Sequence, residues 1–231
     1  MCLNNWGGID HKVLEFHEYV NLFSGKSGSG KSTVMDAIQV ILYGSFSPSF
    51  LNKAADDAKN RRSVLSYLRG EQKDGSANRK DCDFCSVIAL EIEDTGTHII
   101  TCIGIAFEVR KSDSEIKKFV YFSHSGKMPE SEYLTEQGVC YSNQEIKKLV
   151  SARTKSDDNR GKGEVNRIYG SKEAYLGTLY DVILGYIDQN RFITMEKSAI
   201  ALKMTNGTCG RTSGEEWAMP PNSHLNPARN S

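Results

Sequence analysis

Eight residues near the start of the chain, GKSGSGKS at 25–32, have the types and spacing needed to bind phosphate groups. They fit the pattern G-x-x-x-x-G-K-[ST], whose glycines let backbone N–H groups approach phosphate oxygens closely. A lysine at the place of Lys31 supplies a charge between the β- and γ-phosphates, and the Ser32 hydroxyl takes one position on a magnesium ion. The sequence therefore predicts a site for ATP and Mg²⁺. The residues assigned to it are Gly25, Lys26, Ser27, Gly28, Ser29, Gly30, Lys31, Ser32 and Thr33.

The elements on either side of this loop are those that the motif requires. The β-prone run 19–23 precedes it, and we expect a strand there. Apolar residues then recur at helical spacing and predict a helix from about Lys31 to Tyr43, which Gly44 ends. The dipole of that helix favours an anion at its N-terminus.

Composition places the chain among soluble globular proteins. Its 231 residues are enough for one large domain or one and a half, and 29 basic residues balance 29 acidic ones. A net charge of zero gives no overall basic field of the kind that by itself announces a nucleic-acid-binding protein. No apolar run spans a bilayer and no signal-peptide pattern is present, so we expect a cytoplasmic protein without a membrane partner.

Of the six cysteines, only Cys82 and Cys85 have a C-x-x-C spacing. A structural zinc site needs a second such pair, and no cysteine or histidine pair elsewhere has matching spacing. Reduced thiols at the junction of a loop and a strand are the favoured interpretation.

The remaining pattern predicts alternating short strands and helices. It comprises strands at Leu3–Trp6 and Lys12–Phe16 with Gly7-Gly8 between them; an antiparallel meander of Cys85–Glu93, His98–Arg110 and Lys117–His124; helices at Ser63–Arg69, from Ser142 to about Ala152, at Lys172–Tyr186 and at Arg191–Lys203; and a polar link at Lys155–Lys162.

The acidic strand that a complete ATPase needs after its phosphate loop is not evident. The run Val182–Asp188 is the best internal candidate, but it contains a glycine and its spacing also suits a helix. The segment Thr212–Glu216 is superficially similar to an ABC signature but lacks its second glycine. We assign no catalytic residue and expect little ATP hydrolysis by this chain alone.

Four stretches resemble the N-terminal head segment of SMC-like, Rad50/SbcC-type ATPases: Leu3–Gly7, 25–42, Asn52–Ala55 and Ser66–Gly70. The similarity is greatest to the MukB-like condensin subunits of the MksF/JetC (Wadjet) type and covers about residues 3–204. The resemblance implies an α/β fold, an ABC-type P-loop NTPase head lobe with a mixed sheet and an antiparallel meander. It implies an incomplete domain over 1–205 and a disordered or non-family tail at 206–231.

In that family a C-terminal head segment, reached across a long coiled coil, supplies the Walker B strand, the signature and the glutamate that activates water. The resemblance implies this segment as a partner, a homodimer of heads, kleisin-like subunits and DNA. It also implies that Arg69 lies near ATP or DNA, and that Gln189 contacts magnesium. The chain departs from the family in three ways. Its first strand begins about one strand-length late, no heptad coil follows residue 204, and the tail matches nothing in the family. We therefore expect a gene fragment or a frameshifted product.

Two other functions stay open at this point. One is a self-contained small P-loop kinase for a nucleotide or small molecule, for which Arg61, Arg62 and Arg160 give weak support and the meander counts against it. The other is a non-catalytic, ATP-responsive interaction module. The basic residues between 53 and 69 fit either a DNA-contacting patch or an ordinary solvated surface.

Overall fold

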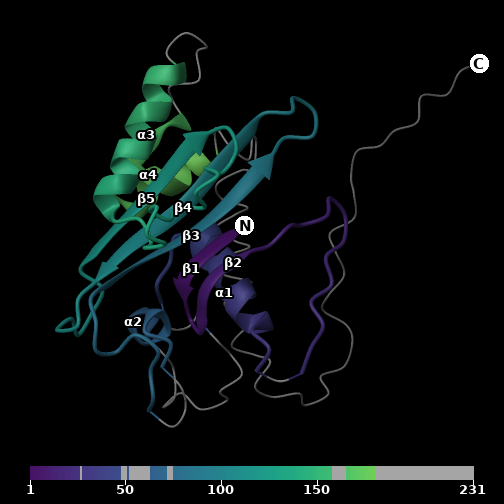
Figure 1. The fold of residues 1–231 in the computed structure, drawn as a ribbon. Coiled ribbons are helices and arrows are strands. Elements are labelled where there is room, and N and C mark those ends of the chain that lie inside the picture. The colour runs from purple at the N-terminus through teal and green to yellow at the C-terminus, as the bar shows by residue number, and fades with distance from the viewer. Residues whose placement is uncertain (27, 48–50, 52–62, 72–74, 158–164, 181–231) are drawn as a thin grey trace, which may run out of the picture.

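A computed structural model describes residues 1–26, 28–47, 51, 63–71, 75–157 and 165–180 of the chain (Figure 1). In chain order, the elements are β1 (Cys2–Trp6), β2 (Ile9–Val13), α1 (Lys31–Tyr43), α2 (Val64–Leu68), β3 (Phe84–Glu93), β4 (Ile100–Val109), β5 (Lys118–Ser125), α3 (Asn143–Asp157), β6 (Arg167–Tyr169) and α4 (Lys172–Thr178).

The described strands form one six-stranded sheet in the order β2-β1-β3-β4-β5-β6. Strands β3, β4 and β5 are the predicted meander, which is confirmed, and β1 pairs with β3 to join it to the N-terminal hairpin. All five pairings in this part of the chain are antiparallel, so it lacks the parallel strands that a mixed sheet would contain.

Helices cover both faces of the sheet (Figure 1). Side chains alternate along β3, so that Ile88 packs into a core with α1, α2 and α4, while Val87 and Ala89 pack into a second core with α3. The first core contains α1, and therefore also fixes the helix that follows the glycine-rich loop.

The N-terminal hairpin is tighter than the sequence predicts. Trp6 pairs with Ile9 across the two-residue turn Gly7-Gly8, so β2 begins at Ile9 and ends at Val13. The predicted bounds of the second strand, Lys12–Phe16, are therefore wrong: only Lys12 and Val13 lie in β2, because the tight turn starts this strand at Ile9.

The strand predicted at 19–23 is also wrong. Those residues form no helix or strand, and Tyr19, Val20 and Leu22 are 87%, 77% and 88% exposed. A β-prone run becomes a strand only where a neighbouring strand accepts its backbone hydrogen bonds, and none of the described strands pairs with it.

Helix α3 confirms the helix start predicted at Ser142 and begins with a capping box. The Glu145 carboxylate accepts from the backbone N–H of Ser142 at 2.7 Å, and the Ser142 hydroxyl accepts from the N–H of Glu145 at 3.3 Å. The helix continues to Asp157, beyond the expected end near Ala152, so the first residues of the predicted polar link are helical. The short strand β6 that follows was not predicted, because three residues give no measurable periodicity.

Helix α4 confirms the start of the helix predicted from Lys172, with the Ser171 hydroxyl as its N-cap. The rest of that helix beyond residue 180, the predicted helix Arg191–Lys203 and the tail 206–231 lie outside the described residues. Among the helices that are described, none has the length and apolar character needed to cross a bilayer.

The second core contains a buried histidine. His124 lies 3.1 Å from the Ser125 carbonyl through Nδ1 and 3.0 Å from the Tyr133 hydroxyl through Nε2. The carbonyl can only accept, so Nδ1 carries the proton and Nε2 accepts from the tyrosine. Burial disfavours the charged imidazolium and lowers the pKa of His124 to about 4.

This depressed pKa predicts a loss of stability in acid. The unfolded chain binds a proton at His124 below pH 6.5 and the folded chain only below about pH 4, so the stabilisation is complete above 6.5 and is lost as the pH falls through that window. The free energy of unfolding should fall by about 3 kcal/mol between pH 6.5 and pH 4. Urea unfolding at several pH values should show it, and His124→Gln should flatten the profile; equal pH slopes for the two proteins would contradict this account.

Candidate nucleotide-binding site

The glycine-rich loop leads directly into α1, as predicted. Gly28 and Gly30 have φ values of 84° and 87°, in the left-handed region that glycine adopts without strain. Gly30 is the N-cap of α1, and no side chain caps the helix there. The first N–H groups of a helix lack partners within the helix, so this end of α1 offers donors to an anion. Ser27, also assigned to the site, lies outside the described residues.

The Lys31 side chain folds back over the loop. Its Nζ donates to the carbonyl of Gly25 at 2.7 Å, to that of Lys26 at 2.9 Å and to the Ser29 hydroxyl at 3.3 Å. These contacts hold a positive charge against the loop backbone, beside the start of α1. Phosphate oxygens entering the loop would meet this ammonium, which is the role that the sequence predicts for it.

Ser32 and Thr33 occupy the first turn of α1 in different environments. Ser32 is exposed to solvent, which leaves its hydroxyl accessible for a magnesium ion. Thr33 faces the sheet: a Cβ added at Gly7 would lie 3.0 Å from its Cγ2 atom, so the two residues pack together closely. A glycine at position 7 is what permits this approach.

Two aromatic side chains hold the first turns of α1. The indole Nε1 of Trp6 donates to the Thr33 carbonyl at 2.9 Å, and the Tyr67 hydroxyl donates to the buried carboxylate of Asp36 at 3.3 Å. The two rings pack at 4.8 Å between centroids. Strand β1 and helix α2 thus fix the position of the phosphate loop through the helix that follows it.

Arg79 contacts both the β1–β2 turn and helix α2. Its guanidinium donates to the carbonyls of Gly7 and Leu68 and to the Asp10 carboxylate, and desolvation by burial lowers its pKa. It therefore joins the β1–β2 turn to the end of α2. Sequence reasoning missed this residue because nothing in the pattern around 75–83 distinguishes it from a solvated loop arginine.

Trp6, Tyr67 and Asp36 were also missed as positioning residues. The available signal was Asp36 itself, a carboxylate among the apolar residues of a predicted helix, since such a group needs a partner when buried. The identity of that partner depends on α2, which is 31 residues further along the chain.

Arg69, which the resemblance places near ATP or DNA, binds backbone carbonyls. Its Nη2 donates to those of Arg110, Lys111 and Asp113, at 3.3, 3.0 and 2.8 Å. The guanidinium thereby joins the end of α2 to the β4–β5 loop. The structure gives it this supporting contact, and its proximity to a ligand stays a prediction.

The remaining candidate residues lie partly outside the described part of the chain. Gln189, the run Val182–Asp188 and the segment Thr212–Glu216 lie outside the described residues. Cys82 and Cys85 are free thiols, and burial raises the pKa of Cys85 to about 11. Within the described ranges no three His, Cys, Asp or Glu side chains gather to hold a metal ion.

The role of Trp6 as a positioning residue is testable with Trp6→Phe. This variant keeps an aromatic ring beside Tyr67 but leaves the Thr33 carbonyl without its donor, which should lower the free energy of unfolding by about 1 kcal/mol. Because the loosened carbonyl belongs to the first turn of α1, affinity for a nucleotide should fall as well. Tyr121→Phe, which removes a buried hydroxyl donor on the Gly44 carbonyl at the other end of α1, is the control. Equal affinities in the two variants would refute a specific role for Trp6.

Residues 1–58 of the 231 match the family described as the P-loop containing region of AAA domain. No curated protein matches the chain. The matched segment includes the N-terminal hairpin, the glycine-rich loop and α1. Taken with the loop geometry, the match shows that this segment is a P-loop region of the nucleotide-binding kind.

Proposed function

We propose that this chain is the ATP-binding N-terminal part of the head of an SMC-like, condensin-type DNA-translocating ATPase. The observation that carries the proposal is the loop 25–33, in which Lys31 folds over the backbone at the uncapped start of α1. A P-loop region alone indicates nucleotide binding; the SMC-like assignment rests on the sequence resemblance.

The geometry of the loop fits a triphosphate and its magnesium ion. Glycines at 28 and 30 keep side chains away from the backbone N–H groups, and the Lys31 ammonium provides a charge beside them. In the bound state these groups would hold the β- and γ-phosphates, and the exposed Ser32 hydroxyl would be one magnesium ligand. Magnesium there would neutralise phosphate charge.

An exposed apolar run next to the loop supports the idea that a further segment completes the head. Tyr19, Val20 and Leu22 are more than three-quarters exposed, although their sequence is that of a buried strand. Burying a large apolar side chain stabilises a protein by about 1.5–3 kcal/mol. Covering these three side chains would therefore be favourable. A strand added beside this run, such as one from a C-terminal head segment, would supply both the backbone partners and the cover.

Hydrolysis on this account needs that added segment. It would bring the acidic strand and the water-activating glutamate, which we do not assign to any residue of this chain. The resemblance further suggests a homodimer of heads, kleisin-like subunits and DNA as partners, in the cytoplasm. The purely antiparallel sheet of the described residues gives no support to the self-contained kinase.

Lys31→Ala tests the nucleotide site. Loss of the charge-assisted contacts of the ammonium should weaken binding of Mg-ATP roughly tenfold to a hundredfold. Isothermal titration calorimetry with the 231-residue chain measures this directly. Lys12→Ala is the control, because it removes the same charge from an exposed position on β2, outside the loop.

The same proteins decide between the alternatives when phosphate release is followed. We expect the wild-type chain to release no more phosphate from Mg-ATP than Lys31→Ala does. Robust hydrolysis that depends on Lys31 would contradict the need for a further segment, and phosphate transfer to a small acceptor would favour the kinase. If the wild-type chain binds Mg-ATP no better than Lys31→Ala, the nucleotide site itself is refuted.

A further inference from the structure

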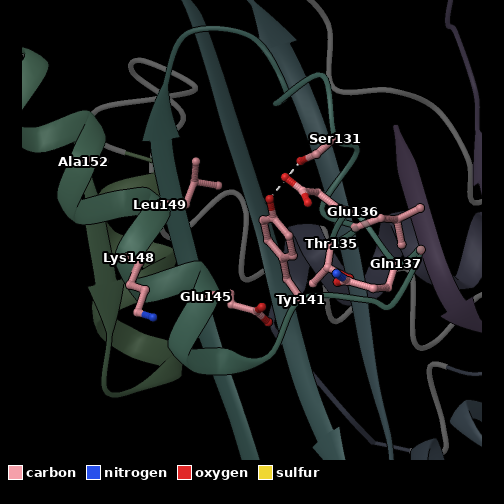
Figure 2. A pocket seen from close by; sticks show the side chains of 11 residues that line it. Ser131, Thr135, Glu136, Gln137, Tyr141, Glu145, Lys148, Leu149 and Ala152 are labelled. Carbon is pink, nitrogen blue, oxygen red and sulfur yellow. Dashed lines mark hydrogen bonds between the residues drawn. The ribbon is translucent and has the colours of Figure 1, made fainter.

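A groove lies between helix α3 and the loop 131–141, on the opposite face of the sheet from α1 (Figures 1 and 2). It has a volume of about 960 Å³. Figure 2 shows the Tyr141 ring between the loop and the helix, with its hydroxyl hydrogen-bonded to Ser131 at 3.0 Å. Leu134, Leu149 and Ala152 form much of the remaining wall. This face takes no part in the nucleotide site.

The loop wall of the groove is held rigidly from beneath. Tyr133 is fully buried and contacts His124, and its neighbour Leu134 forms a β-bridge with Cys140. The Glu132 carbonyl accepts from the Asn4 side chain at 2.7 Å, which fixes the loop to β1. The groove is therefore formed before a ligand binds. Binding would not include the entropic cost of ordering the loop.

Lysines line the helix side of the groove and continue beyond it. Lys148 belongs both to the groove and to an adjoining hollow of about 390 Å³, which Lys147 and Lys155 also line. All three are exposed, and within the described residues no ion pair joins them to a carboxylate. They extend over about 12 Å of α3. A positive strip thus runs along the helix beside the apolar centre.

Two acidic residues line the groove: Glu145 lies on α3 itself, one turn before Lys148, and Glu136 lies on the loop. The Glu145 carboxylate is taken up by the backbone N–H and hydroxyl of Ser142, at 2.7 and 2.9 Å. Glu136 lies on the exposed loop side. The groove accordingly has an apolar centre, a negative charge at Glu136 on the loop side, and a lysine strip along α3 beyond Glu145, whose carboxylate is hydrogen-bonded to Ser142.

We propose that this groove binds an acidic, amphipathic peptide segment of a partner protein. Acidic side chains of the peptide would lie over Lys147, Lys148 and Lys155, and an apolar side chain would fill the space between Leu134 and Leu149. A nucleic-acid backbone would satisfy the lysines but would leave the apolar centre unused. Charge and apolar surface together therefore favour a peptide.

A synthetic peptide in which glutamate and leucine alternate is the probe. An extended chain advances about 3.3 Å per residue, so about eight residues cover both hollows. Fluorescence anisotropy of the labelled peptide with the full chain should show saturable binding that weakens as salt is added. The double variant Lys147→Glu with Lys148→Glu should bind at least about tenfold more weakly, because it reverses two charges at the contact.

A control variant, a second peptide and duplex DNA serve as comparisons. Lys12→Glu reverses an exposed charge on β2 and should leave binding unchanged. A peptide of alternating glutamate and serine should bind more weakly than the leucine peptide. The proposal is overturned if the leucine peptide does not bind, if Lys12→Glu weakens it as much as the double variant, or if duplex DNA alone binds in a Lys148-dependent way. ATP affinity should not change in the double variant, so this test and that of the nucleotide site fail independently.

Discussion

The hydrogen bond from the Trp6 indole to the Thr33 carbonyl connects the antiparallel sheet to the phosphate loop. Without it, the start of α1 would depend on packing and on the Tyr67–Asp36 hydrogen bond, and the donors at the helix N-terminus would be fixed less firmly. Tyr67 supports the indole ring, and Arg79 binds the carbonyl of Gly7, the turn residue that follows β1. A loop that must present backbone N–H groups to phosphate oxygens depends on this support, because small displacements weaken such contacts steeply.

The same loop is fixed on one side and open on the other. The run 19–23 leads into it with Tyr19, Val20 and Leu22 in solvent, and the loop residues Ser29 and Ser32 are exposed as well. Exposed apolar surface of this kind is typical of an interaction site. This asymmetry fits the proposed function, in which the chain holds the nucleotide and a further segment supplies the groups that hydrolyse it. Binding and hydrolysis would then be divided between two segments.

Local patterns predicted the elements whose determinants are local. The apolar spacing of α1, the alternation in β3 and the capping box of Ser142 and Glu145 each lie within a few residues, and all three are confirmed. The run 19–23 failed because strand formation depends on a partner strand, which the pattern does not contain. The contacts of Arg79 link residues 69 and 72 positions apart, so no local rule could have found them. For the same reason the site's ligand-facing loop was predictable and its supports were not.

Hydrogen–deuterium exchange with and without Mg-ATP tests directly whether the loop at 28–33 binds the nucleotide, because it follows each backbone N–H of the loop separately. The account predicts slower exchange at 28–33, where the donors at the start of α1 would bind phosphate, and unchanged exchange in α3. Protection confined to other segments, or no change at 28–33 at saturating Mg-ATP, would contradict the assignment of this loop as the nucleotide site.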